Sequence, residues 1–198
     1  MEQTALVTGS PARVADVADA LEKVGFAVLR AGPDPEGLAA ACGQLSPSSL
    51  GCYVSLPRER VVSAPTLVER VREFLTQGLL ARFDAATTVL PYLEPEACVL
   101  LVAGNLPGAA TPDDHHARID LLRVLARAIL AECLDRDVRA VVVGHDHSAE
   151  EIADLALRRG DEHGRRVAQV AALPADLNYE DWQREVLSLT TNPTTNEE

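Results

Sequence analysis

The sequence lacks the features that mark several protein classes. Its four cysteines are scattered without a C-x-x-C pair, which argues against a disulfide framework or a zinc site. No apolar run is long enough to span a membrane, and no basic segment precedes an apolar one at the N-terminus, as in a signal peptide. Basic residues are outnumbered, with 18 Lys and Arg against 30 Asp and Glu, and the net charge is −12. We therefore expect a cytoplasmic protein with buried, reduced thiols and without nucleic-acid or membrane partners.

The length and composition favour one globular unit. The 198 residues, of which 47% are hydrophobic, are enough to bury a sizeable core. We expect a single domain over residues 1–187. Residues 188–198 carry few apolar side chains, so this segment is predicted to be a disordered tail.

The N-terminal stretch predicts a β–α–β unit. An apolar run at residues 5–7 breaks at Thr8-Gly9, and apolar residues then recur at intervals of three and four up to Val24. Gly25 follows as a helix-ending residue, and residues 26–29 read as a second strand. Such a unit implies a parallel sheet with right-handed crossovers.

The turn after the first strand is the candidate cofactor site. In parallel sheets a dinucleotide pyrophosphate rests there on the helix N-terminus, so Thr8, Gly9 and Arg13 are the candidate cofactor-binding residues. Gly9 is the one glycine of this turn, Pro11 has no N–H to donate, and Val14 places a branched side chain where close approach is needed. We therefore expect a vestigial site that holds no cofactor.

The rest of the chain continues the alternation of strands and helices. Ser148 and Glu151 have the spacing of a capping box at a helix start. Further strands are predicted at residues 50–56, 96–103, 139–143 and 166–172, and further helices at residues 36–44, 65–75, 78–93, 115–134, 149–159 and 178–187.

Histidines and carboxylates cluster in two segments that follow strands. They are His115, His116, His145, His147, Asp113, Asp114 and Asp146. The carboxyl ends of neighbouring parallel strands meet at one edge, so these groups could do acid–base work or hold a divalent metal there. The alternative is two solvated loops whose histidines never meet. No H-x-x-x-H or H-E-x-x-H spacing occurs, so we assign no metal site and name His115 and His145 as candidate catalytic residues.

Four segments together resemble the short-chain dehydrogenase/reductase (SDR) family over roughly residues 4–172. They are TALVTG, ATTVLPYL, LLRVLARAILAECLDRDVRAVVV and SAEEIADLALR. The resemblance implies an α/β fold: a Rossmann-like three-layer αβα sandwich with a mostly parallel sheet, in a shortened form. It also implies where the family's functional residues would lie.

Most of those positions carry other residues here. Thr8 and Gly9 match the start of the family's Thr-Gly-x-x-x-Gly-x-Gly loop, whose other glycines would fall near Ala12 and Val14. The family's catalytic Tyr, Lys and Ser would fall near His115, Ile119 and Ala103, and its helix Asn near Gln77 or Gly78. An isoleucine can neither hold the ribose nor lower the pKa of a neighbouring acid. The resemblance thus implies a degenerate, truncated member, a pseudoenzyme that is not an NAD(P)-dependent oxidoreductase on its own.

Helices 78–93 and 115–134 are those through which the family pairs its subunits. Both carry broad apolar rows here, made of Leu79, Leu80, Phe83 and Leu90 on one and Leu121, Leu122, Leu125 and Ile129 on the other. We expect a homo-oligomer, or a heteromer with an intact SDR, through these helices. The leading hypothesis is a non-catalytic oligomerising subunit or partner of an active SDR-type enzyme. One alternative is a lyase, isomerase or hydrolase using His115 and His145, and another is a small-ligand sensor using the vestigial crevice.

Overall fold

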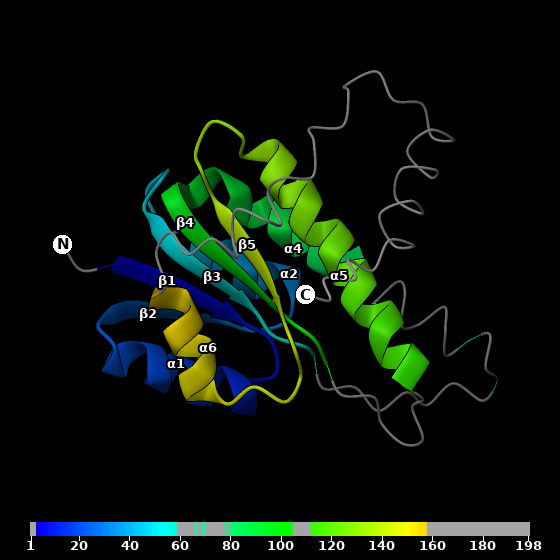
Figure 1. Ribbon diagram of the computed structural model, residues 1–198. Coiled ribbons are helices and arrows are strands. Elements are labelled where there is room, and N and C mark those ends of the chain that lie inside the picture. The colour runs from blue at the N-terminus through cyan, green and yellow to red at the C-terminus, as the bar shows by residue number, and fades with distance from the viewer. Residues whose placement is uncertain are drawn as a thin grey trace, which may run out of the picture.

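The described residues form a five-stranded sheet with helices on both faces, seen in a computed structural model (Figure 1). The structure describes residues 3–58, 80–104 and 112–157, with the backbone alone over 112–118, and the single positions 66, 69 and 78. The elements are, in chain order, β1 (Gln3–Thr8), α1 (Pro11–Lys23), β2 (Phe26–Ala31), α2 (Pro35–Cys42), β3 (Leu50–Ser55), α4 (Ala81–Val89), the 3-10 helix η2 (Leu90–Tyr92), β4 (Leu93–Val102), α5 (Pro112–Glu132), β5 (Arg139–Val143) and α6 (Ala149–Leu157).

All neighbouring strands in the sheet run parallel, which confirms the predicted Rossmann-like α/β fold. Their order is β2-β1-β3-β4-β5. The chain therefore moves one way from β1 to β2 and the other way from β3 onward. The gap between the carboxyl ends of β1 and β3 is the topological switch point, where ligands bind in sheets of this kind.

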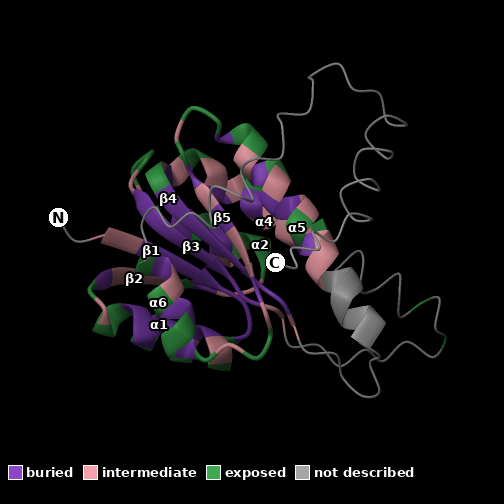
Figure 2. Cartoon of the chain, in the orientation of Figure 1, coloured by how far each residue is buried: buried purple, intermediate pink, exposed green. Residues whose placement is uncertain are grey.

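The helices divide the core into two apolar layers. On one face α1 and α6 pack on the sheet, and Val14, Val17 and Leu21 of α1 are buried there. On the other face α2, α4 and α5 cover the sheet. Figure 2 shows the strands as the most deeply buried part of the chain. Residues 97–103 are buried on both faces, as the lack of alternation in that segment predicts.

Several predicted boundaries are corrected by the structure. Strand β4 begins at Leu93 rather than at residue 96, because Leu93 is buried opposite Leu50 in register. A bulge follows, with Glu96 at a φ of 64°, and Pro95 and the acidic residues there hid the strand signal. The helix predicted over residues 78–93 ends earlier as an α-helix, because α4 ends at Val89 and the 3-10 helix η2 follows. Helix α5 begins at Pro112, before the predicted residue 115, and ends at Glu132.

Other predictions fall outside the described residues, or nearly so. The helix at 65–75 is described only at positions 66 and 69, and the strand at 166–172, the helix at 178–187 and the tail at 188–198 are not described. Among the helices that are described, none combines the length and apolarity needed to cross a bilayer.

Candidate functional site

The turn between β1 and α1 is closed by hydrogen bonds to the segment that follows β3. The N–H of Leu56 donates to the carbonyl of Thr8 at 2.8 Å, and the N–H of Ser10 donates to the carbonyl of Pro57 at 3.2 Å. Gly9 has a φ of +143°, and a Cβ added there would lie 2.6 Å from the Cβ of Leu56. The N–H of Ser10, a donor that would otherwise face a pyrophosphate, is therefore already used.

The side chains predicted to bind a cofactor are engaged within the protein. The buried hydroxyl of Thr8 shares a hydrogen bond of 3.2 Å with the hydroxyl of Tyr53, a residue of β3. The guanidinium of Arg13, in the first turn of α1, donates through Nη2 to the backbone carbonyl of His147. Arg13 thus ties the start of α1 to the loop between β5 and α6 across the carboxyl edge of the sheet.

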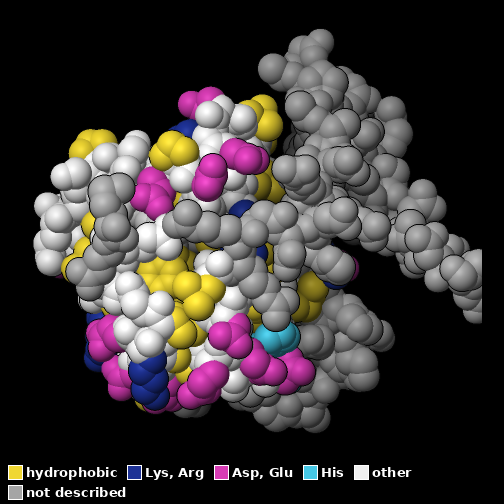
Figure 3. Space-filling view, turned by 60° about the vertical axis from the view of Figure 1, so that its left-hand side comes forward, with side chains coloured by type: hydrophobic (Ala, Val, Ile, Leu, Met, Phe, Trp, Pro, Cys, Tyr) yellow, Lys and Arg dark blue, Asp and Glu magenta, His cyan; other side chains and the backbone are white. Residues whose placement is uncertain are grey.

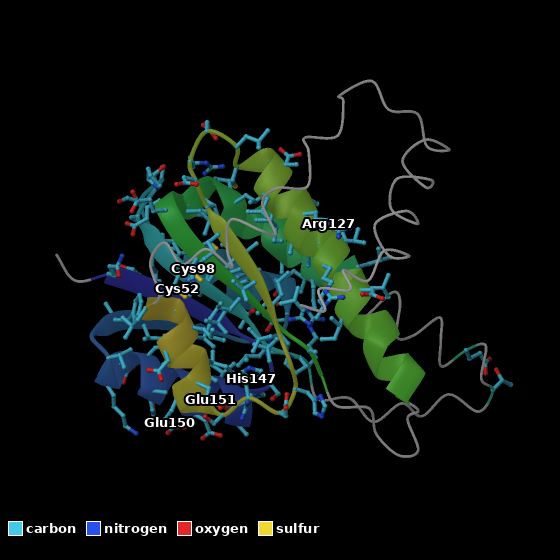
Figure 4. The ribbon with its side chains drawn as sticks, in the orientation of Figure 1. Cys52, Cys98, Arg127, His147, Glu150 and Glu151 are labelled. Atoms are coloured by element: carbon cyan, nitrogen blue, oxygen red, sulfur yellow. The ribbon has the colours of Figure 1, made fainter. Side chains whose placement is uncertain are left out.

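The loop after β5 is acidic and is fixed by the cap of α6. The hydroxyl of Ser148 accepts from the N–H of Glu151 at 3.1 Å, and the carboxylate of Glu151 accepts from the N–H of Ser148 at 2.7 Å, which confirms the predicted capping box. Nδ1 of His147 lies 3.4 Å from a carboxylate oxygen of Asp146 and has no hydrogen-bond partner among the described residues. Figure 3 shows acidic side chains gathered around a histidine on this side of the molecule, and Figure 4 places Glu150 and Glu151 beside His147.

The predicted meeting of His115 and His145 is not settled by the described side chains. His145 lies exposed in the loop after β5, while His115 belongs to α5, where only the backbone is described. Strands β4 and β5 are direct parallel neighbours, so their carboxyl ends lie side by side. The catalytic role of this pair stays a prediction. Over the part of the chain with described side chains, no group of three His, Cys, Asp or Glu is placed to hold a metal ion.

A polar cluster at the carboxyl ends of β3 and β4 was missed by the sequence analysis. Nε of Arg82 donates to the hydroxyl of Ser55 at 3.1 Å, and Nη2 donates to the carbonyls of Ser55 and Val102, the latter at 2.9 Å. Burial lowers the pKa of Arg82 to about 10. One signal could have found it: Arg82 lies at the start of α4, and a cation there opposes the helix dipole, so another role should be sought for it.

The sequence analysis also missed a cysteine pair on neighbouring strands. Cys52 of β3 and Cys98 of β4 are register partners and both are buried (Figure 4). Nη2 of Arg139 donates to the sulfur of Cys98 at 3.0 Å and to the carbonyl of Leu155 at 2.6 Å. The hydrogen bond from Cys52 and the nearby Arg139 lower the pKa of Cys98, and the same hydrogen bond and burial raise the pKa of Cys52. Cys98 is therefore the thiol of the pair that ionises first.

Comparison with known proteins identifies the fold. A short-chain dehydrogenase/reductase from Serratia marcescens superposes with a TM-score of 0.59 at 12% identity, covering 82% of this chain and 92% of that one. A doubly substituted variant of a Serratia marcescens short-chain dehydrogenase/reductase gives 0.62 at 13%, covering 83% and 92%. The E. coli protein BdcA gives 0.56 at 16%, covering 84% and 94%. The fold is that of the short-chain dehydrogenases/reductases. No protein-family model and no curated protein matches the sequence.

Two described positions at which the resemblance predicts SDR catalytic residues carry apolar side chains. Ile119, at the expected lysine position, packs partly buried against the core beneath α5. Ala103, near the expected serine position, is buried at the end of β4. Neither side chain has a group that can donate or accept a proton.

Proposed function

We propose that this chain is a non-catalytic SDR-like protein that acts by assembling with a second copy of itself. The observation that carries the first half of this proposal is the closed turn between β1 and α1. A pyrophosphate needs free N–H groups at the helix start, close approach of the backbone and a positive local field. Ser10 donates its N–H to Pro57, Pro11 has none, and Arg13 is bonded to the loop at His147.

The surroundings of the closed turn add to the argument against an anionic cofactor. Asp146 and Glu150 are exposed beside the loop that Arg13 contacts, and Glu151 is exposed in the cap of α6. Exposed carboxylates near a phosphate site repel a pyrophosphate, most strongly at low salt. Val14, which stands near the position of a family glycine, is buried in the core shared with α6. Removing one of these contacts alone would therefore not open the site.

The support for assembly comes from apolar side chains on the outer side of α4 and α5. Leu80, at the start of α4, is 52% exposed. On α5 the side chains of Leu121 and Val124 remain partly exposed. Three members of the predicted α5 row, Leu122, Leu125 and Ile129, instead face the sheet and are buried. The surface proposed to pair therefore consists of Leu121 and Val124 on the outer side of α5, together with Leu80.

The test compares two charge substitutions on opposite faces of the sheet. Leu80→Glu places a charge on the proposed interface, and Leu157→Glu places the same charge on α6, where Leu157 is 45% exposed. We expect light scattering after size exclusion to find an oligomer for the unaltered protein and for Leu157→Glu, and a monomer for Leu80→Glu. Circular dichroism checks that both variants are folded.

Two results would contradict the proposal. A stable monomer at micromolar concentration, with no partner co-purifying from the native host, removes the assembly half. A micromolar dissociation constant for NAD or NADP in isothermal titration removes the cofactor half. Co-purification of an intact SDR in place of self-association would redirect the proposal to a heteromer.

A further inference from the structure

A row of three register partners crosses the sheet from β3 to β5. Cys52 of β3 pairs with Cys98 of β4, and Cys98 pairs with Arg139 of β5. Side chains of register partners in parallel strands point to the same face, and both cysteines belong to the core layer beneath α1 and α6. The two thiols are therefore direct neighbours, with a guanidinium beside them (Figure 4).

The spacing of the strands suits a bond between the two sulfurs. Neighbouring strands lie about 4.7–4.9 Å apart, and the two Cα atoms of a disulfide usually lie about 4.4–6.8 Å apart. Register partners whose side chains share a face meet this requirement. The other two cysteines, Cys42 and Cys133, lie in the opposite core layer, so the sheet separates them from this pair.

Arg139 makes the two thiols chemically unequal. Its Nη2 donates to the sulfur of Cys98 at 3.0 Å and to the carbonyl of Leu155 on α6 at 2.6 Å, so the cation is held against that sulfur. Cys98 is 4% exposed and Cys52 is 0% exposed. The thiolate is the form of cysteine that reacts with oxidants, and a neighbouring cation favours it. Cys98 is thus the thiol that reacts first, with Cys52 in place as its partner.

We propose that Cys98 and Cys52 form a reversible redox pair that hydrogen peroxide converts to a disulfide between β4 and β3. In the first step the Cys98 thiolate attacks one peroxide oxygen; the O–O bond breaks, the sulfur is oxidised to a sulfenic acid, and hydroxide leaves and combines with the proton that Cys98 had released. In the second step the sulfur of Cys52 attacks the sulfur of Cys98; an S–S bond forms, the S–O bond breaks, and the leaving hydroxide takes the Cys52 proton. Two electrons pass from the thiols to the peroxide, which is reduced to two waters.

A small neutral oxidant fits the burial of this pair. Hydrogen peroxide is little larger than water, whereas a protein thiol or glutathione is too large to reach a sulfur with so little exposed surface. The redox pair lies in the core layer beneath α1 and α6, on the face of the sheet opposite to α4 and α5. The proposal is therefore independent of the assembly proposed above.

The experiment treats the folded full chain with hydrogen peroxide and locates the disulfide. Remaining thiols are alkylated in urea, and the tryptic peptides are compared by mass spectrometry with and without dithiothreitol. Cys52→Ala is the test variant, because it keeps Cys98 and removes its partner. Cys42→Ala is the matched control, since Cys42 is also buried, at 2% exposure, but lies on the other face of the sheet. Cys42 and Cys52 share one tryptic peptide, residues 31–58, so this control also shows which of the two is bonded to Cys98.

We expect a disulfide between Cys52 and Cys98 in the unaltered protein and in Cys42→Ala, and dithiothreitol should restore both thiols. In Cys52→Ala the sulfenic acid of Cys98 should persist and be captured by dimedone. Survival of all the thiols under conditions that oxidise glutathione would overturn the proposal. Oxidation of Cys98 without a bond to Cys52 would also overturn it, as would oxidation of Cys42 or Cys133 as readily as Cys98.

Arg139→Gln tests Arg139 as a positioning residue for the first step. Cys52 and Arg139 are the titratable groups that act on the pKa of Cys98, and the α1 and α6 side chains in this core layer are apolar. The variant should slow the oxidation of Cys98 at neutral pH by at least about threefold, and the difference should shrink as the pH rises to where an ordinary thiol ionises. Arg136→Gln is the control, because Arg136 contacts the sulfur of Cys133 at 3.4 Å, and its rate should match that of the unaltered protein. Equal slowing by Arg139→Gln at every pH would overturn this role.

Discussion

Replacement of Gly9 by alanine tests whether the turn after β1 is set by packing rather than by a ligand. Gly9 has a φ of +143°, a region that side-chain-bearing residues rarely adopt. A Cβ there would lie 2.6 Å from the Cβ of Leu56 and 3.0 Å from its carbonyl oxygen. Leu56 cannot simply move away, because its N–H donates to Thr8, and the next residue accepts from Ser10.

The expected cost of Gly9→Ala has two parts. The backbone conformation costs about 1–3 kcal/mol for a non-glycine residue. Overpacking against Leu56 adds about 1–3 kcal/mol. Gly25→Ala is the matched control, because Gly25 has a φ of +98° but nothing lies within 4 Å of the added Cβ. The control should carry only the backbone cost, so the two variants should differ by about 1–3 kcal/mol.

The measurement is urea denaturation followed by circular dichroism, with the same m-value required of both variants. Each kcal/mol should also lower Tm by about 2–4 °C for a chain of this size. If Gly9→Ala loses no more stability than Gly25→Ala, the contact with Leu56 does not constrain the turn and the argument for a closed site fails. The argument for a closed site would also fail if the Gly9→Ala variant kept its stability but bound a nucleotide more weakly than the unaltered protein does.

Two further predictions follow from burial and from the cysteine pair. Leu122→Glu should unfold the protein rather than release monomers, because Leu122 is 4% exposed and faces the sheet. Loss of the far-ultraviolet circular dichroism signal checks this, and the control variant Leu80→Glu should remain folded. Cys98 should ionise below the pKa of an ordinary thiol, so its thiolate absorbance should appear at lower pH than that of a free cysteine, and Arg139→Gln should move that transition upward. A transition at the ordinary pKa in the unaltered protein would contradict the second prediction.

Local patterns in the sequence were enough to predict most of the elements. The apolar spacing after Gly9 indicates α1 because one face of that helix is buried against the sheet. Ser148 and Glu151 mark the start of α6 because both ends of a capping box lie within one turn. Spacing identifies the apolar stripe of α5 but not the surface that each residue meets, and the structure places Leu122 against the sheet.

The residues that the sequence analysis missed are those brought together by register across the sheet. Cys52 and Cys98 are far apart in the chain and face each other only because β3 and β4 pair with a bulge between their first two register partners. No local pattern fixes that offset. Arg82 reaches the carbonyl of Val102 because α4 begins beside the carboxyl ends of β3 and β4. These contacts depend on topology, so single-sequence reasoning could place the elements but not their neighbours.

The two sides of the carboxyl edge have opposite electrostatic character. On the α1 and α6 side, Arg13 is bonded across the gap to the loop at His147, and Asp146 of that loop and Glu150 and Glu151 at the start of α6 are exposed. On the α4 side, Arg82 donates to the hydroxyl and carbonyl of Ser55 and to the carbonyl of Val102. An anion approaching this edge is repelled on the first side and attracted on the second.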